Sequence, residues 1–317
     1  MEIYNDISEL PQANTHTGFT SGKFEGIHTG HQRLFRKLAE YCGSNGLVPT
    51  VIAFRNDPRD VTGAADHIEH MIYTIKDRAH FIGECGIERI IFVPFNQNLA
   101  HISAESFVTD IMKQRMKAHY AVCGEDFRFG RSREGDARSF VRLCSANGIK
   151  AEVEEEYTFK GEKISSSKIC RLIKNGEFEQ ASLHLGRRYH IEGTVHKGRG
   201  IGKTIGFPTL NIWYPDEVLI PEGVFAAVAK IKGKKYHAAV NSGKRPTFGE
   251  NGKNIVEVHL LTGTVPENII HIKLYPVVKI RDEKGFSDTD TLSEQIRKDC
   301  SRIKRILQDY KPLNADE

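Results

Sequence analysis

The 317-residue chain is long enough for two ordinary domains. Hydrophobic residues make up 39% of it and charged residues 27%, an ordinary balance for a folded protein. The net charge of +4 is mild, so it suits phosphorylated substrates but gives no support to a nucleic-acid partner.

The sequence carries none of the signals of a membrane or secreted protein. No run reaches the roughly 18 apolar residues that a membrane span requires, and the start, Met-Glu-Ile-Tyr-Asn-Asp, lacks the basic and apolar regions of a signal peptide. The six cysteines are scattered without a Cys-x-x-Cys pair, which argues against a zinc site or a disulfide framework. We expect a cytoplasmic protein with reduced thiols and no membrane partner, either a monomer or a weak homo-oligomer.

Strands and helices are predicted to alternate over the first part of the chain. Apolar runs predict strands over residues 48–54, 89–93, 119–123 and 149–153. Four groups of residues recur at helical spacing and predict helices between the strands. The groups are Leu34, Leu38, Tyr41 and Cys42; Ile68, Ile72, Ile75, Ala79 and Ile82; Phe107 and Ile111; and Phe140, Leu143 and Cys144. This alternation predicts a parallel sheet with helices on its faces, which binds ligands at the carboxyl ends of its strands.

The pattern changes beyond Arg187. Strands are predicted over residues 189–196, 224–231, 235–240, 255–261 and 270–278, with glycines and prolines between them and no convincing helix. The last segment places Leu292, Ile296, Ile303 and Leu307 on one helical face. We predict an α/β domain over residues 1–185 and a small β-barrel with a terminal helix over residues 186–317.

A glycine-rich segment, residues 21–31, lies between a short first strand and the first helix. Glycines let the backbone turn tightly and approach a ligand, and a helix N-terminus offers N–H groups to a phosphate. His28 and His31 flank Gly30 at that helix start, where imidazoles can stabilise charge on a phosphate during transfer. No third ligand candidate lies at suggestive spacing, so a zinc site is not favoured.

This segment resembles a known family. His28-Thr29-Gly30-His31 resembles the His-x-Gly-His signature of nucleotidyltransferases, and residues 22–32 resemble the bacterial bifunctional riboflavin kinase/FAD synthetase family. The resemblance implies a Rossmann-like nucleotidyltransferase domain. There the two histidines stabilise the α-phosphate of ATP while the FMN phosphate attacks it and pyrophosphate leaves. Gly22, Lys23 and Gly30 would contact phosphate.

Two further segments match the same family. Residues 124–130 resemble Gly-x-Asp-Phe-Arg-Phe-Gly, which implies flavin or nucleotide contacts from Asp126, Phe127 and Arg128. Residues 164–169 resemble Ile-Ser-Ser-Thr-x-Ile, in which hydroxyls at a helix start hold triphosphate oxygens. The residues that would do so here are Ser165, Ser166, Ser167 and Lys168. An ordinary serine helix cap is the alternative for that segment.

The N-terminal part also departs from the family pattern. Glu25 stands where the family has Asp, and Lys23 where it has Asn. Asn56-Asp57-Pro58 replaces Pro-His-Pro, which removes an imidazole, and Cys170 replaces an arginine. These changes leave open whether the adenylyltransferase domain is fully active.

The segment 198–204, Gly-Arg-Gly-Ile-Gly-Lys-Thr, is not a P-loop. Three residues, not four, separate Gly198 from Gly202, and Gly206-Phe207-Pro208 follows where a helix should begin. Residues 206–211 instead resemble the riboflavin kinase signature Gly-x-Pro-Thr-Ala-Asn. The resemblance implies that Thr209 and Asn211 ligate Mg²⁺ on the phosphates of ATP, the co-substrate, and oxygen ligands suit that ion. The basic loop with Lys197, Gly198, Gly202 and Lys203 would cover the nucleotide.

Three more segments of the C-terminal part match the riboflavin kinase pattern. They are residues 221–226, 241–249 and 256–261, and the last implies that Glu257 is the base that deprotonates riboflavin. Asn241, Arg245 and Phe286 would contact the flavin, together with the closing helix. Without the resemblance, Glu257 would be interpreted as an outward-facing strand residue.

The sequence therefore predicts a two-step enzyme, riboflavin to FMN and FMN to FAD, each step using ATP and Mg²⁺. Two alternatives remain: a riboflavin kinase with a degenerate N-terminal domain, and a non-catalytic sensor of flavin or nucleotide. Thr209, Asn211 and Glu257 argue against the sensor, which needs neither a metal clamp nor a base.

Overall fold

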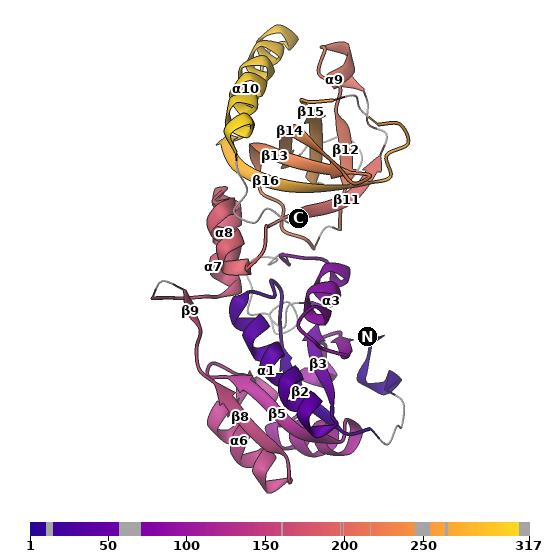
Figure 1. Ribbon diagram of the computed structural model, residues 1–317, viewed down its shortest axis with the longest axis vertical. Helices are drawn as coiled ribbons and strands as arrows, with labels where there is room; N and C mark the ends of the chain where they lie inside the picture. The colour runs from indigo at the N-terminus through magenta and orange to yellow at the C-terminus, as the bar shows by residue number, and fades with distance from the viewer. Residues whose placement is uncertain are drawn as a thin grey trace. The chain divides into compact units, whose positions relative to one another are not determined.

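The computed structural model describes residues 1–10, 15–56, 71–159, 161–196, 198, 200–215, 217–244, 254–263 and 266–310. The chain divides into two compact units, Met1–Ser165 and Ser166–Glu317, and we describe each by itself (Figure 1). Residues 166–185, which the sequence analysis assigns to the first domain, fall in the second unit. The reason is that α7 (Ser166–Asn175) packs on α8 (Phe178–Leu185), and α8 contacts a strand of the barrel.

The first unit is built on a six-stranded parallel sheet in the order β1-β4-β3-β2-β5-β8 (Figure 1). Its strands are β1 (Glu2–Tyr4), β2 (Thr17–Gly22), β3 (Val48–Phe54), β4 (Arg89–Val93), β5 (Ala118–Gly124) and β8 (Lys150–Glu154). The predicted strands 48–54 and 89–93 agree to the residue. Both are apolar runs buried along nearly their whole length, as expected of strands covered on both faces.

Helices cover this sheet. They are α1 (Thr29–Asn45), α3 (Ile75–Gly83), α4 (Gln97–Ala100), α5 (Ala104–Ser106), η2 (Phe107–Arg115) and α6 (Ala137–Ala146). Helix α1 packs on β2, β3 and β5 through Leu34, Leu38 and Cys42. The helix predicted from Ile68 onward is shorter in the structure: Thr74 caps α3 by accepting from the Asp77 N–H, so Ile72 precedes the helix. Ile68 lies outside the described residues.

Short elements complete this unit. They are η1 (Ile7–Glu9), β6 (Arg128–Phe129), η3 (Arg131–Arg133), β7 (Gly135–Asp136), β9 (Thr158–Phe159) and β10 (Glu162–Lys163). Strands β6 and β7 form an antiparallel pair, and β6 lies within the segment 124–130 that resembles a flavin-binding motif. One hydrophobic core of the first unit contains Phe19, Val108, Phe129 and Phe140.

The second unit is a closed six-stranded barrel in the order β11-β12-β15-β14-β13-β16. Its strands are β11 (Ile191–His196), β12 (Leu210–Trp213), β13 (Gly223–Ile231), β14 (Lys234–Lys244), β15 (Asn254–Leu260) and β16 (His271–Arg281). Five of these were predicted. The sixth, β12, is only four residues long and follows a proline, so it left too short a pattern to be recognised.

Besides α7 and α8, the described part of the second unit contains helices α9 and α10. Helix α9 (Ile201–Thr204) is a single short turn, in keeping with the rejection of a P-loop. Helix α10 (Thr289–Asp309) is the predicted terminal helix; it packs on β13 and β14, and buries Ile303 and Leu307 (Figure 1). The predicted fold class, α/β followed by a β-barrel with a terminal helix, is confirmed.

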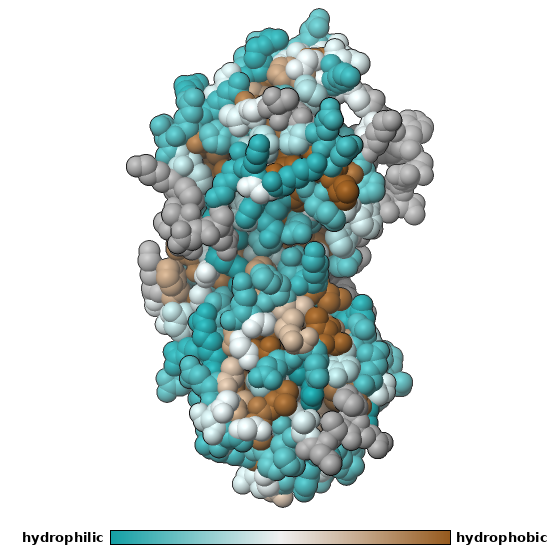
Figure 2. Space-filling model, turned by 45° about the vertical axis from the view of Figure 1, so that its right-hand side comes forward, coloured by the Kyte–Doolittle hydropathy of each residue, from teal (hydrophilic) through white to brown (hydrophobic). Residues whose placement is uncertain are grey.

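The surface shown in Figure 2 is mostly hydrophilic, with hydrophobic residues exposed in small separate areas. In the part of the chain that the structure describes, no helix combines the length and the apolar composition needed to cross a membrane.

Candidate functional site

The first candidate site lies where the strand order of the parallel sheet reverses. From β2 the chain continues to β3 and β4 on one side, then returns to β5 and β8 on the other. Strands β2 and β5 are neighbours, and they end at Gly22 and Gly124. The glycine-rich segment and the flavin-like segment therefore both leave the sheet at its carboxyl edge, at the switch point where open α/β sheets bind ligands.

The two predicted histidines meet at the start of α1. His28 is the N-cap of the helix and is buried; its Nδ1 accepts a hydrogen bond from the His31 N–H at 3.3 Å. The two imidazoles stack with ring centroids 3.6 Å apart and planes 19° apart. Because Nδ1 of His28 is the acceptor, a neutral His28 carries its proton on Nε2.

Gly30 makes room for this stack. A Cβ on Gly30 would lie 3.3 Å from the His28 ring, which is tighter than nine in ten real Cβ contacts. Lys23, which follows Gly22, pairs its ammonium with the Glu25 carboxylate at 2.6 Å, and Glu25 is almost fully buried. Lys23 and Glu25, the two residues that differ from the family pattern here, thus form an ion pair with each other in the segment before the histidines.

The segment after β5 presents two polar side chains and one ring that turns inward. Asp126 and Arg128 are exposed, and Asp126 pairs with Lys163 at 3.4 Å. Phe127 packs against the core, with its ring 5.4 Å from that of Phe129 and 5.1 Å from that of Phe140. Phe127 therefore anchors this segment, and the flavin contact predicted for it stays a prediction.

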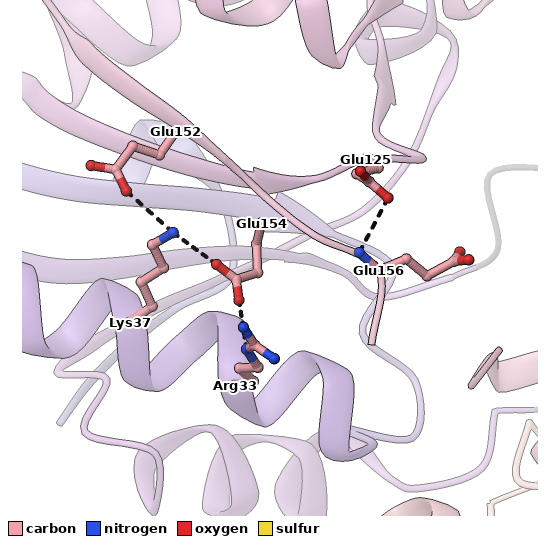
Figure 3. A network of polar contacts seen from close by, with 6 residues as sticks. All are labelled: Arg33, Lys37, Glu125, Glu152, Glu154 and Glu156. Atoms are coloured by element: carbon pink, nitrogen blue, oxygen red, sulfur yellow. Dashed lines mark hydrogen bonds and ion pairs between the residues drawn. The ribbon is translucent and has the colours of Figure 1, made fainter. Parts of the chain in front are cut away.

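A polar network connects α1 with β8, the strand next to β5 (Figure 3). The Lys37 ammonium lies between the carboxylates of Glu154, at 2.7 Å, and Glu152, at 3.2 Å. Glu154 also pairs with the Arg33 guanidinium at 2.6 Å. These two carboxylates raise the pKa of Lys37. The network fixes the helix that carries the histidines against the sheet.

The residues just after β8 lie close to Gly30, which stands between the two histidines at the start of α1. The Glu156 N–H donates to the Glu125 carboxylate at 3.2 Å, which connects the flavin-like segment to this strand end (Figure 3). Tyr157 follows, exposed, with the Arg33 guanidinium 5.9 Å from its ring centroid. Its Cβ would lie 3.6 Å from a Cβ on Gly30. Tyr157 could not be predicted as a site residue, because a lone aromatic residue after a strand matches no motif.

The unit division falls inside the serine motif, with Ser165 in the first unit and Ser166, Ser167 and Lys168 in the second, where α7 begins at Ser166. Asp57 and Pro58 lie outside the described residues.

The second candidate site is a cavity of about 270 Å³ in the barrel unit. Asn211 on β12 is the register partner of Glu257 on β15, which is in turn the register partner of Asn241 on β14. All three line the cavity, together with Thr209. The barrel therefore collects residues predicted from separate motifs into one row across three adjacent strands.

Glycines cover the polar end of this row. A Cβ on Gly198 would overlap the Asn211 carboxamide, and one on Gly202 would lie 3.2 Å from the Thr209 hydroxyl. The loop backbone thus lies directly on these two side chains. Lys203, in α9, is exposed, and Lys197 lies outside the described residues.

Helix α10 and the segment before it supply an apolar part of the lining through Phe286, Leu292 and Ile296. The wall is fixed by a partly buried ion pair, in which Arg281 donates from Nε and Nη2 to the buried Asp299, each at 2.8 Å. The predicted Phe286 therefore lies in the cavity, whereas Arg245 lies outside the described residues.

His259 and Glu283 are polar cavity residues that were not predicted from the sequence. His259 Nδ1 is 2.8 Å from the Pro208 carbonyl, so the imidazole holds the strand entry that positions Thr209. Glu283 also lines the cavity, and its pKa is raised by burial and by the charges of Glu222 and Glu257. His259 stands two residues after Glu257 on the same strand face, which was the one available signal.

Comparison with known proteins distinguishes the interpretations. A family model described as FAD synthetase matches residues 10–168, and one described as riboflavin kinase matches residues 185–307. A Bacillus subtilis bifunctional riboflavin kinase/FMN adenylyltransferase is 31% identical over 293 residues, 92% of each chain. The chain belongs to the bifunctional riboflavin kinase/FMN adenylyltransferase family.

Other relatives agree. The Escherichia coli K12 member of this family is 29% identical and covers 93% of each chain, and one from Buchnera aphidicola is 28% identical over 97% of this chain and 99% of its own. The crystal structure of a Streptococcus pneumoniae protein named macrolide-efflux protein has a TM-score of 0.82 at 24% identity, over 98% of this chain and 99% of that one, which shows the shared fold.

The chain is therefore an ATP-using enzyme with a riboflavin kinase domain and an FMN adenylyltransferase domain. The two alternatives left open by the sequence, a kinase with a degenerate N-terminal domain and a non-catalytic sensor, are not supported.

Proposed function

We propose that riboflavin is phosphorylated in the barrel cavity, with Glu257 as the general base. The observation that carries this proposal is the row of Asn211, Glu257 and Asn241 across three neighbouring strands, all facing one cavity. A carboxylate in that row can accept the proton of the riboflavin 5′-hydroxyl as its oxygen attacks the γ-phosphorus of ATP. The bond to the β,γ-bridging oxygen then breaks, and FMN and ADP leave.

We propose that Thr209 and Asn211 hold a Mg²⁺ ion that accompanies the ATP phosphates. A hydroxyl and an amide oxygen are hard ligands that suit Mg²⁺, and few protein ligands are needed because phosphates and water complete its shell. The glycine backbone lies on both side chains, so the loop would cover phosphates bound at this ion. When bound, the ion would neutralise charge on the phosphates during transfer.

The cavity lining also suggests how riboflavin is oriented. Its isoalloxazine ring suits the apolar side chains of Phe286, Leu292 and Ile296, and its ribityl chain suits the polar row. Asn241 would donate to or accept from a ribityl hydroxyl beside Glu257. His259 keeps Thr209 in place through the Pro208 carbonyl.

We propose that His28 and His31 act in adenylyl transfer at the switch point of the first unit. An FMN phosphate oxygen attacks the α-phosphorus of ATP, the bond to the bridging oxygen breaks, and pyrophosphate leaves. The imidazole N–H groups and the first turn of α1 would donate to the oxygens on which charge develops. Gly22, Lys23 and Gly30 shape this turn, while exposed Asp126 and Arg128 are available to FMN or nucleotide.

We propose that Ser165, Ser166, Ser167 and Lys168 contact the triphosphate of the same reaction. We also propose a cytoplasmic location and a monomer or weak homo-oligomer. The location is supported by the six cysteines, all of which are free thiols in the structure.

One incubation tests the division of labour. The protein is given riboflavin, ATP and Mg²⁺, and the flavins are separated by chromatography over time. We expect FMN to rise first and FAD to follow, because FMN is the product of one site and the substrate of the other. If FAD formed without FMN accumulating first, and labelled FMN added to the mixture were not converted to FAD, the two reactions would not take place at separate sites. If no phosphorylated flavin formed at all, the proposal would be contradicted.

A further inference from the structure

The turn that precedes the histidine pair adopts an uncommon backbone. Phe24 and Ile27 both have positive φ angles, 44° and 46°, although neither is glycine. Bulky residues rarely occupy this region, and they stay there only when the surroundings fix them. Something outside the turn must therefore hold its backbone.

Arg78, from α3, supplies those contacts. Its side chain is completely buried, and its three nitrogens donate to three backbone carbonyls: Nε to Phe24 at 2.9 Å, Nη2 to Lys23 at 2.6 Å, and Nη1 to Phe54 at 2.9 Å. Two of these carbonyls belong to the turn, and the third ends β3. The guanidinium fork therefore ties the turn to the carboxyl edge of the sheet.

Arg78 remains a cation in this position. Burial lowers the pKa of its guanidinium to about 10, and the negative charge of Glu25 opposes that change. The group is therefore protonated at neutral pH, and all its donors are available to the carbonyls. Hydrogen bonds from an ionised donor are stronger than those between neutral groups.

The ring of Phe24 connects the turn to the histidines. The Phe24 ring contacts His31 edge-on, with centroids 4.9 Å apart and planes 87° apart, and it also contacts Phe35 at 4.8 Å. His31 in turn stacks on His28. A shift of the Phe24 backbone would therefore move the ring against which the His31 imidazole packs.

We propose that Arg78 is a positioning residue for adenylyl transfer, which holds the Lys23–Phe24 backbone so that Phe24 fixes the stacked imidazoles of His28 and His31. This inference rests on the role proposed for the two histidines. Arg78 itself contacts neither histidine in any described interaction, so its effect passes through Phe24. A misplacement of about 1 Å at a reacting group can cost about 10²-fold in rate.

The test compares Arg78→Met, which removes the donors, with Arg78→Lys, which keeps a buried cation with three donors. The matched control is Arg89→Met: Arg89 is also a buried arginine of the first unit, but it bonds Glu2 at 2.7 Å, far from the turn in sequence. For each protein, kcat and KM are measured for FMN adenylylation, riboflavin phosphorylation is measured as an internal reference, and the histidine Cε1–H signals are followed by NMR against pH.

We expect Arg78→Met to lower adenylylation kcat by about 10²-fold, to shift the titration of His28 and His31, and to leave riboflavin phosphorylation within about twofold. Arg78→Lys should recover most of the loss, and Arg89→Met should retain the parent kcat even if it melts at a lower temperature. Parent-like kcat and histidine titrations in Arg78→Met, or equal losses in Arg78→Met and Arg89→Met, would overturn the inference.

Two further variants separate the possible failures. Phe24→Leu leaves the Arg78 donors intact but removes the ring, so a lowered kcat with the parent unfolding temperature supports the proposed route even if Arg78→Met does not fold. A parent-like kcat in Phe24→Leu overturns that route. If His28→Ala, His31→Ala retains full adenylylation, the proposed function of the histidines fails, which differs from a failure confined to Arg78.

Discussion

Asn211 and Glu257 are direct register partners across β12 and β15 of the barrel, although 46 positions separate them in the sequence. Asn241, the partner of Glu257 on its other side, completes the row. Directly paired residues of neighbouring antiparallel strands point to the same face of a sheet, and α10 together with the loop before β12 covers this face to enclose the cavity. A proposed metal ligand, a base and a flavin contact are thus fixed relative to one another by backbone pairing.

Glu257→Gln should nearly abolish FMN formation. The amide keeps the size and most hydrogen-bonding capacity of the carboxylate but cannot take the proton of the 5′-hydroxyl, and general-base assistance is typically worth about 10²–10⁴-fold. The measurement is the initial rate of FMN formation together with riboflavin binding by fluorescence. Binding should persist, and a rate within a few-fold of the parent would remove Glu257 from this role.

Thr209→Ala and Asn211→Ala should each weaken the use of Mg²⁺–ATP by the kinase and spare adenylylation of added FMN. Each removes one proposed oxygen ligand, so the Mg²⁺ concentration needed for half-maximal kinase rate should rise. Thr194→Ala is the matched control, because Thr194 lies on neighbouring β11 and bonds His196 at 3.0 Å, away from the lining residues. An unchanged Mg²⁺ dependence in both variants contradicts the assignment.

Gly198→Ala should impair the kinase through Asn211. The new methyl group would overlap the Asn211 carboxamide, which is the end of a flexible side chain and would rotate away, so its oxygen would leave the position proposed for Mg²⁺. We expect kcat/KM for ATP to fall by about tenfold, which corresponds to about 1.4 kcal/mol. Gly43→Ala, which meets nothing within 4 Å, is the control. Equal kcat/KM for ATP in the Gly198 variant and its parent would show that the loop does not lie on Asn211 in solution.

Thiol labelling should depend on burial. Burial raises the pKa of Cys42 and Cys300 to about 11, and of Cys123 and Cys144 to about 12, so few thiolates form at neutral pH. Cys170 is only half-buried. With an alkylating reagent at pH 7.5, mass spectrometry should find Cys170 modified first. The labelling rates of the four buried thiols, Cys42, Cys123, Cys144 and Cys300, should rise as the pH increases toward 9. Labelling of Cys300 as fast as that of Cys170 would mean that the kinase cavity is more open than described.

The sequence predicted best what depends on local pattern. Strands 48–54 and 89–93 are continuous apolar runs between turn signals, and the position of His28 at a helix start followed from the glycines around it. By contrast, β12 is too short to leave a period, and α8 was missed in a stretch where polar residues interrupt the apolar ones.

The site residues that the sequence missed depend on distant partners. Arg78 lies in an amphipathic helix, where an arginine would normally face water; its burial depends on carbonyls at positions 23, 24 and 54. His259 acquires its contact only when β15 pairs with β12 near Pro208. No local pattern could show either.

The double variant His28→Ala, His31→Ala, compared with Glu257→Gln, tests the central claim of two sites most directly. Each protein is incubated with ATP and Mg²⁺ and with either riboflavin or FMN, and the flavin products are quantified. We predict that the histidine variant converts riboflavin to FMN at the parent rate and makes FAD about 10²–10³-fold more slowly, the usual cost of losing a transition-state donor. Glu257→Gln should make FAD from supplied FMN but no FMN from riboflavin. Loss of both activities in either protein, with the fold intact, would contradict the assignment of one reaction to each unit.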